Sequence, residues 1–196
     1  MPHFYNYKEK YFISTNFKVM YSTLRRQQYL KKVKLFFLMF SKKDKFIIVR
    51  EPYDRMESFF RDRLRKRLTN DDEWLRSQKI FFKPLNVQKG STTEKYEALA
   101  NLSFEEFIKL LPVVFNKNRH LHPQNYIFKR ILPKRILKLN NATDMEFLAS
   151  NLKLNIEIKA NSTDKMKTDI KWTNELIEIV NQVYHKDFML YSFEKK

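Results

Sequence analysis

The chain has 196 residues, 43% of them hydrophobic and 15% aromatic, which is enough to bury a core and excludes an intrinsically disordered protein. Its single glycine, Gly90, excludes the glycine-rich nucleotide-binding loops, and the lack of cysteine in the sequence excludes disulfides and thiolate metal sites. The net charge of +17 favours an anionic partner: nucleic acid, an acidic polysaccharide, a membrane surface or a highly charged nucleotide. No run approaches the ~18 apolar residues of a membrane-spanning helix, so we expect a soluble, cytoplasmic protein.

Two strand–loop–helix units are predicted in succession near the start of the chain. Residues 11–15 (YFIST) predict a short strand, and residues 17–37 predict a turn followed by a basic amphipathic helix capped by Ser22 or Thr23. Residues 45–49 (KFIIV) predict a buried strand, which Pro52 ends. The next segment is typical of a helix that carries on one face Met56, Phe59, Phe60, Leu64 and Leu68. Two such units indicate an α/β fold with a parallel sheet.

The rest of the chain predicts mainly helices. Residues 69–100 are polar and predict an irregular excursion. Ser103 and Glu106 then form a capping-box pattern at the start of a helix whose inward residues are Phe104, Phe107, Leu110 and Leu111. A strand and two helices are expected after it, over residues 135–139, 143–152 and 172–191. Because the sequence shows no internal repeat and no linker, we expect a single domain over residues 1–196.

Arg50 follows the second predicted strand, where a parallel sheet delivers its residues to a ligand crevice. Ser58 is expected near the start of the following helix, whose amides favour an anion. The guanidinium and the hydroxyl would then converge on one phosphate. The alternative is that Arg50 pairs with Asp54 or Glu51 and that Ser58 is an ordinary helix residue.

The turn after the first predicted strand places Lys18 before the adjacent hydroxyls of Ser22 and Thr23. This order matches the last residues of a phosphate-binding loop without its glycines, so Lys18, Ser22 and the backbone amides could hold a phosphate. The alternative is a capped helix that a solvated lysine precedes.

Together, the segments KVMYSTLRR and REPYDRMES resemble the carbohydrate sulfotransferase family, which includes the chondroitin, dermatan and heparan O-sulfotransferases. The segments LSFEEFIKLL, HLHPQ and VYHKDFMLYSF resemble further motifs of that family, so the resemblance runs from about Tyr11 to Phe193. The lack of a membrane anchor and of cysteines makes the chain similar to a minimal, soluble, microbial member.

The resemblance implies how a donor nucleotide, 3′-phosphoadenosine 5′-phosphosulfate, would be bound. Lys18 and the loop residues around it would bind the 5′-phosphosulfate, and Arg50 with Ser58 would bind the 3′-phosphate. A second phosphate-contacting loop would include Ser162 and Lys165. The full set of cofactor-binding residues implied in this way is Lys18, Tyr21, Ser22, Thr23, Arg50, Ser58, Ser162 and Lys165.

The resemblance also implies two catalytic residues. Lys18 would neutralise the charge that develops on the bridging oxygen as the phosphate leaves, and His120 would take the proton of the acceptor hydroxyl. His122 is the alternative base, because Gln124 could orient either ring. A purely structural role of His120, in the turn before Pro123, is a further alternative. No metal is required.

We therefore predict a P-loop-like, three-layer α/β domain with a short parallel sheet flanked by helices. It would transfer a sulfuryl group to a hydroxyl of a glycan or polysaccharide, including acidic ones, and no nucleic-acid partner is expected. One alternative is a basic nucleic-acid-binding protein without catalysis, although the sequence contains no nucleic-acid module signature. The other is an inactive relative that binds the nucleotide and transfers nothing. The sequence does not indicate an oligomeric state.

Overall fold

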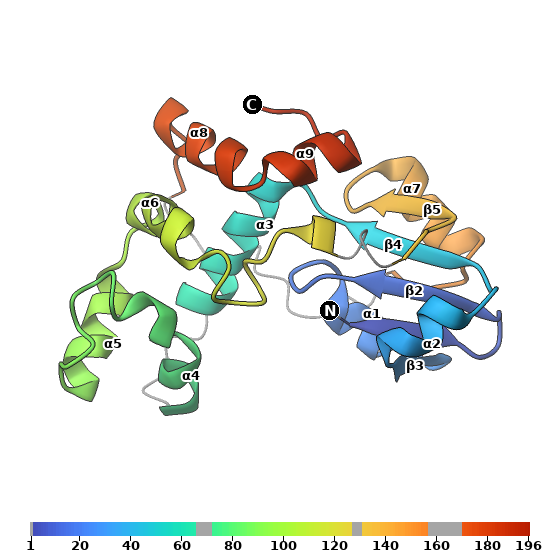
Figure 1. Ribbon diagram of the computed structural model, residues 1–196, viewed down its shortest axis with the longest axis horizontal. Coiled ribbons are helices and arrows are strands. Elements are labelled where there is room, and N and C mark those ends of the chain that lie inside the picture. Colours follow the sequence, from blue (N-terminus) through green and yellow to red (C-terminus); the bar gives the residue numbers. More distant parts are fainter. Residues whose placement is uncertain (1, 66–71, 127–130, 157–169) are drawn as a thin grey trace. The chain divides into compact units, whose positions relative to one another are not determined.

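The computed structural model describes residues 2–65, 72–126, 131–156 and 170–196 (Figure 1). The chain forms two compact units, each built from separate stretches of sequence. The sheet unit comprises Met1–Glu51, Gln124–Ser162 and Lys186–Phe193, and the helical unit comprises Pro52–Pro123, Thr163–His185 and Glu194–Lys196. The single domain expected over residues 1–196 stays a prediction.

The sheet unit contains a five-stranded sheet in the order β3-β1-β2-β4-β5 (Figure 1). The parallel strands β2, β4 and β5 are the three that the sequence predicts, whereas β1 is antiparallel to both β2 and β3. The strands are β1 (His3–Asn6), β2 (Tyr11–Thr15), β3 (Leu30–Val33), β4 (Lys45–Val49) and β5 (Arg135–Lys138). The predicted parallel sheet is therefore present, and two antiparallel strands extend it.

Helices of the sheet unit cover both faces of this sheet. Along β4, Phe46 and Ile48 join one buried cluster with Leu24 and Leu148, whereas Ile47 and Val49 join a second cluster. The helices that supply partners are α1 (Tyr21–Arg25) and α7 (Ala142–Ser150) in the first cluster, and α2 (Leu35–Phe40) and α9 (His185–Tyr191) in the second. Since alternate strand residues point to opposite faces, the arrangement confirms the three-layer, P-loop-like α/β prediction.

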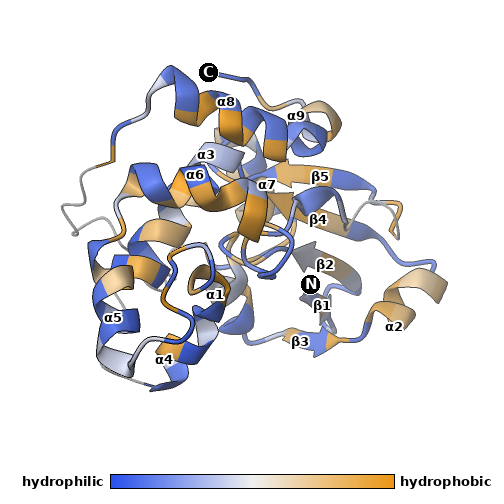
Figure 2. Ribbon diagram, turned by 60° about the vertical axis from the view of Figure 1, so that its left-hand side comes forward, coloured by the Kyte–Doolittle hydropathy of each residue, from blue (hydrophilic) through white to orange (hydrophobic). Residues whose placement is uncertain are grey.

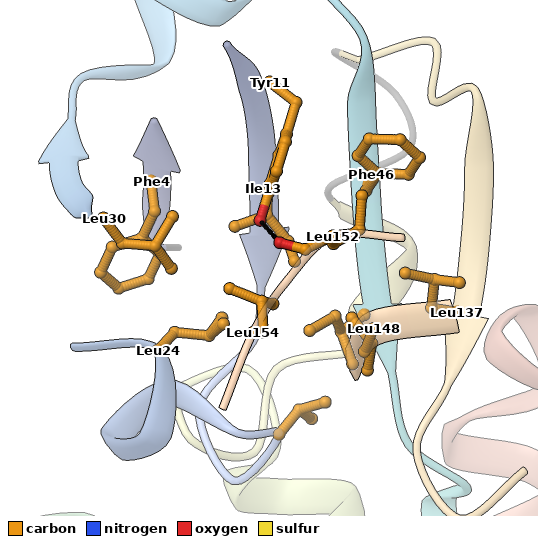
Figure 3. Close-up of a cluster of buried hydrophobic side chains, with 12 residues drawn as sticks. Phe4, Tyr11, Ile13, Leu24, Leu30, Phe46, Leu137, Leu148, Leu152 and Leu154 are labelled. Carbon is orange, nitrogen blue, oxygen red and sulfur yellow. Dashed lines mark hydrogen bonds between the residues drawn. The ribbon is translucent and has the colours of Figure 1, made fainter. Parts of the chain in front are cut away.

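Figure 3 shows the first cluster, in which leucines of α1, of α7 and of the residues that follow α7 pack against the strands. Within it, the Tyr11 hydroxyl donates a hydrogen bond of 2.8 Å to the carbonyl of Leu152 and accepts one of 3.1 Å from the Asn6 side chain. Burial raises the pKa of Tyr11 to about 12, because the ionised phenol would lose its hydration there. The hydrogen bond from Tyr11 to Leu152 ties the segment that follows α7 to the sheet.

The prediction of one basic amphipathic helix within residues 17–37 is wrong. The structure has α1, then strand β3, then α2 in its place, because β3 pairs with β1 in the register Phe4↔Lys32. The expected cap at Ser22 or Thr23 is also wrong, since α1 begins after Met20, whose side chain makes no capping hydrogen bond. The lysines of β3 are exposed, as expected for a strand at the edge of a sheet.

The helical unit is built around aromatic rings. Phe59 stacks on Phe107 with ring centroids 5.4 Å apart, and Phe60 and Phe81 are also fully or almost fully buried. Figure 2 shows α6 and α8 with alternating hydrophobic and hydrophilic residues, which is the pattern of amphipathic helices. The unit contains α3 (Pro52–Phe59), a π-helical segment η1 (Phe60–Arg65), α4 (Asp72–Ser77), the 3-10 turn η2 (Lys79–Phe81), α5 (Thr92–Asn101), α6 (Phe104–Val114) and α8 (Asn174–Val183).

Local signals predict part of this unit correctly. The Ser103–Glu106 capping box is present at the start of α6. The irregular excursion expected over residues 69–100 is wrong where α4 and α5 lie, and α5 starts at a second capping box, Ser91 with Glu94. The long helix expected at 172–191 is broken at Tyr184 into α8 and α9. Among the described residues, no helix combines the length and the apolar character that crossing a bilayer requires.

Candidate functional site

The loop between β2 and α1 contains Lys18 and adopts a left-handed backbone without glycine. Lys18 has φ 69° and Met20 has φ 51°, a region that costs non-glycine residues about 1 kcal/mol or more. Two hydrogen bonds support this path: the Thr15 hydroxyl donates to the carbonyl of Val19, and the Asn16 side chain accepts from the amide of Phe17 at 2.9 Å. The buried end of β2 thus holds Lys18 in a fixed, half-buried position.

The residues after this loop form α1. Tyr21 is half-buried and packs edge-on against Phe17, with ring centroids 5.2 Å apart. Ser22 is half-buried and Thr23 is buried. A cavity of about 280 Å³ lies beside the helix and is lined by Phe4, Tyr21, Arg25, Leu30 and Lys32. Two cationic side chains, Arg25 and Lys32, are among the residues that line it.

Arg50 follows β4 directly, and its side chain reaches the Lys18 loop. One guanidinium nitrogen, Nη1, donates to the carbonyl of Lys18 at 3.4 Å. This proximity follows from the topology, because β2 and β4 are parallel neighbours and their carboxyl ends meet at one edge of the sheet. The structure therefore brings together Lys18 and Arg50, two of the residues that the sequence predicts.

Gln124 fixes the backbone of Arg50. Its fully buried side chain accepts from the Arg50 amide at 2.9 Å and donates to the Arg50 carbonyl at 2.7 Å. The turn of Gln124 is held in its own place by Asp187, whose carboxylate accepts from the amides of Gln124 and Asn125 at 2.8 Å each. The Tyr191 hydroxyl donates to the carbonyl of Gln124 at 2.9 Å.

These contacts correct the expectation that Gln124 orients a histidine ring, since both ends of its amide bind the backbone of Arg50 instead. The supporting role of Gln124 was missed because it pairs with a residue 74 positions away. The HLHPQ pattern was the available signal, but a sequence pattern does not show which backbone a buried amide binds.

Ser58 lies in the helical unit, in the last turn of α3, and is half-buried. The expectation that it stands near the start of its helix is wrong, because the helix begins at Pro52 and not at Met56. Proline is favoured in the first turn, where its missing amide hydrogen costs nothing. The argument that first-turn amides help Ser58 to bind an anion therefore does not apply.

The backbone of the His120–His122 turn is fastened within the helical unit. Arg55, which is fully buried, donates to the carbonyls of His120 at 3.1 Å and His122 at 2.6 Å. The Tyr184 hydroxyl donates to the intervening carbonyl of Leu121 at 2.8 Å. Three consecutive carbonyls are thus held by the side chains of Arg55, in α3, and of Tyr184, which directly follows α8.

The two histidine side chains differ in their hydrogen bonds. Nε2 of His120 lies 2.8 Å from a guanidinium nitrogen of Arg63. Because a guanidinium only donates, His120 accepts through Nε2, and its neutral ring carries the proton on Nδ1. Nε2 of His122 lies 2.9 Å from the carbonyl of Asn116, which can only accept, so that nitrogen carries a proton.

Two predicted residues, Ser162 and Lys165, lie outside the described residues. Within the described part of the chain, no group of three or more histidine, aspartate or glutamate side chains gathers as a metal site would require.

A family model described as "Sulfotransferase family" matches residues 4–194. The match agrees with the resemblance that the motifs around Lys18 and Arg50 indicate. Neither a search of the curated proteins nor one of the solved structures gives a match.

Proposed function

Because this chain belongs to the sulfotransferase family, we propose that it transfers a sulfuryl group from 3′-phosphoadenosine 5′-phosphosulfate to a hydroxyl of a carbohydrate acceptor. The observation that carries the proposal is the contact between Arg50 and the Lys18 loop at the carboxyl ends of β2 and β4. Two cations at one sheet edge suit a donor that carries two separate phosphate groups.

The chemistry of the candidate binding residues supports an anionic donor. Lys18, Tyr21, Ser22 and Thr23 offer an ammonium and three hydroxyls for the 5′-phosphosulfate, and none of them is a carboxylate. The nearby cavity, with its aromatic rings and cations, offers space for part of such a nucleotide. Ser162 and Lys165 are proposed as further contacts.

Arg50 is the proposed ligand of the 3′-phosphate, together with Ser58. A guanidinium can donate two parallel hydrogen bonds to a phosphate, which makes the contact directional as well as strong. The two bonds from Gln124 fix the backbone of Arg50, so less conformational freedom is lost when the phosphate binds. A donor with a 3′-phosphate is therefore favoured over a nucleotide without one.

The reaction exchanges one sulfur–oxygen bond for another. The acceptor hydroxyl oxygen forms a bond to sulfur, and the bond between sulfur and the bridging oxygen of the phosphosulfate breaks. Lys18 stabilises the negative charge that moves onto that bridging oxygen. His120, or else His122, accepts the proton of the acceptor hydroxyl. By analogy with phosphoryl transfer, most of the catalysis comes from positioning and charge stabilisation.

The acceptor is proposed to be a glycan or polysaccharide, and the net charge of +17 suits an acidic one. Electrostatic attraction raises the encounter rate with a polyanion, so transfer to acidic polysaccharides should fall as salt is added.

Two measurements test the proposal. Calorimetric titration should show that adenosine 3′,5′-bisphosphate binds at least about tenfold more tightly than adenosine 5′-monophosphate, because the 3′-phosphate adds charged hydrogen bonds. Incubation with sulfur-labelled donor should then move label onto members of a polysaccharide panel. Equal affinity for the two nucleotides would contradict the donor assignment, and selective binding without any transfer would identify an inactive relative.

A further inference from the structure

Helix α2 of the sheet unit presents large hydrophobic side chains to solvent. The exposed fractions are 64% for Phe36, 59% for Phe37, 50% for Met39 and 72% for Phe40, and we call these four residues the α2 patch. Figure 2 shows α2 as hydrophobic along its length. Leu38, by contrast, is fully buried in the second core cluster of the sheet unit, and the half-buried Leu35 packs against that cluster, so two leucines anchor the helix while the α2 patch faces solvent.

The exposed rings form one cluster. Phe36 and Phe40, one helical turn apart, have ring centroids separated by 4.6 Å, and Phe36 and Phe37 have centroids separated by 6.2 Å. Isolated exposed apolar residues need no explanation, but a contiguous group marks an interaction surface. A partner that covers this group must accept aromatic rings and the thioether of Met39.

Exposed lysines flank the α2 patch on both sides. Lys31, Lys32 and Lys34 precede it, and Lys42 and Lys43 follow it. The segment 31–45 contains six lysines and one acidic residue, Asp44, which forms an ion pair of 2.6 Å with Lys134. The partner must therefore be negatively charged as well as apolar.

The partner must be both apolar and negatively charged, and these two requirements decide which class of partner fits the surface. A second copy of this chain would bring like-charged lysines together and is disfavoured by repulsion. An acidic polysaccharide or a nucleic acid would pair with the lysines but would not bury Met39 in an apolar environment. A bilayer with anionic lipids meets both demands, because its headgroups attract lysines and its interface accepts aromatic rings.

We propose that the α2 patch and its flanking lysines form a docking surface for anionic lipid bilayers. The phenylalanine rings enter the interface between headgroups and acyl chains, and the ammonium groups of Lys34 and Lys42 bind lipid phosphates and carboxylates. This surface lies on the sheet unit. Of its flanking lysines, Lys32 also lines the cavity described above, whereas Lys34 and Lys42 do not.

Co-sedimentation of the full chain with vesicles tests the proposal. Binding should be strong to vesicles of phosphatidylcholine mixed with phosphatidylserine, weak to phosphatidylcholine alone, and reduced by added salt. The Phe36→Ser/Phe40→Ser double variant should lose at least about tenfold in binding, since it removes two interfacial rings. Lys34→Gln/Lys42→Gln should lose about fivefold for each lysine.

Matched control variants show whether the loss of vesicle binding is specific to the α2 patch or follows from removing any exposed apolar or charged side chain. Leu132, which is 88% exposed, is outside the α2 patch, and Lys186 is an exposed lysine of α9. Leu132→Ser and Lys186→Gln should bind vesicles like the unaltered chain. Circular dichroism melting should show that all four variants are folded, because every substituted side chain is exposed.

Several outcomes would overturn the proposal. One is equal binding by the unaltered chain and the Phe36→Ser/Phe40→Ser variant. Another is equal binding to vesicles with and without phosphatidylserine. A third is a dimer that sediments as such without vesicles and dissociates in the phenylalanine variant. A fourth is phenylalanine-dependent binding of a single-stranded oligonucleotide in place of vesicle binding.

Discussion

The side-chain amide of Gln124 is hydrogen-bonded to both backbone groups of Arg50, to the amide at 2.9 Å and to the carbonyl at 2.7 Å. The residue that we propose to bind the 3′-phosphate is thus held by one that does not itself need to contact the nucleotide. This makes Gln124 a positioning residue, and its effect should be visible in nucleotide selectivity.

Gln124→Ala should reduce the affinity for adenosine 3′,5′-bisphosphate by about tenfold while leaving the affinity for adenosine 5′-monophosphate almost unchanged. The reason is that two backbone groups of Arg50 lose their partners, at a cost of about 1–3 kcal/mol each, and the guanidinium is no longer aligned. Calorimetric titration of both nucleotides measures the effect.

Tyr191→Phe is the control for this variant. It removes a buried hydrogen bond to the carbonyl of Gln124 and leaves the side chain of Gln124 in place. It should lower the melting temperature without changing the preference for the bisphosphate. A Gln124→Ala variant that loses affinity for both nucleotides equally would mean that Gln124 supports the fold alone.

Arg50→Ala and Ser58→Ala should each weaken bisphosphate binding, by about 1.5–3 kcal/mol for the charged hydrogen bonds of Arg50 and by less for a single hydroxyl. Arg50→Lys keeps the charge but cannot donate the bidentate pair of hydrogen bonds, so it should recover only part of the affinity for the bisphosphate. Isothermal titration is the measurement. Unchanged affinity in both alanine variants, with melting temperatures intact, would remove the 3′-phosphate assignment.

The elements that the sequence predicts well are those with a local signal. Strands β2 and β4 are short, apolar runs within the chain and are present with the predicted bounds. The Ser103–Glu106 capping box is likewise contained within four residues. In such cases, neighbouring residues carry enough of the signal to place the element, although β2 and β4 still pair with each other across about thirty residues.

One element that the sequence does not predict, β3, depends on a distant partner, whereas α5, also not predicted, does start at a local capping box. Strand β3 reads LKKV, and it is a strand because it pairs with β1, nearly thirty residues earlier. No local pattern records this pairing, and strand propensity depends strongly on such context. The candidate site shows the same division: the loop positions of Lys18 and Arg50 follow from the strand order, whereas the contacts of Gln124 and Arg55 require the folded chain.

Lys18→Ala should lower the transfer rate more than it lowers donor affinity. The ammonium is expected to bind the leaving oxygen most strongly when charge develops there, and only such differential binding raises the rate. Single-turnover transfer and bisphosphate titration on one preparation provide the comparison. Equal losses in both would mean that Lys18 only holds the ground-state phosphosulfate, and normal turnover would exclude the loop from the site.

His3 should make the protein acid-sensitive. Burial lowers the pKa of His3 to about 4, and its Nδ1 lies 2.8 Å from the Ser14 hydroxyl. Between pH 6.5 and 4 the unfolded chain therefore binds more protons at this residue than the folded chain. The contribution of His3 to the free energy of unfolding is thus fully present above this window and is lost as the pH falls through it. The contribution of His3 should amount to about 2 kcal/mol between pH 8 and pH 5.

Urea unfolding at several pH values checks this effect in the unaltered chain and in His3→Gln. The glutamine can still bind the Ser14 hydroxyl but does not titrate, so its stability should fall less between pH 8 and pH 5. Parallel pH profiles for the two proteins would show that another group controls the acid sensitivity.

His120→Ala tests the proposed general base. The test is specific because the turn that contains His120 is held through its backbone. The carbonyls of His120, Leu121 and His122 are held by Arg55 and Tyr184 through backbone contacts that do not involve the imidazole. Removing the ring should therefore leave the turn in place, with the melting temperature and bisphosphate affinity close to those of the unaltered chain. Transfer should fall by roughly 10²–10⁴-fold if the ring accepts the proton.

The guanidinium of Arg63 adds a second part to this prediction, because it occupies Nε2 of His120 at 2.8 Å. That nitrogen can take a proton from an acceptor hydroxyl only after the bond to Arg63 breaks. Arg63→Met should therefore lower transfer much less than His120→Ala does. His122→Ala is the matched control, since it removes a ring from the same turn. A specific rate loss in His122→Ala, with His120→Ala fully active, would assign the base to His122. A lower melting temperature with preserved turnover in His120→Ala would leave His120 only a structural role.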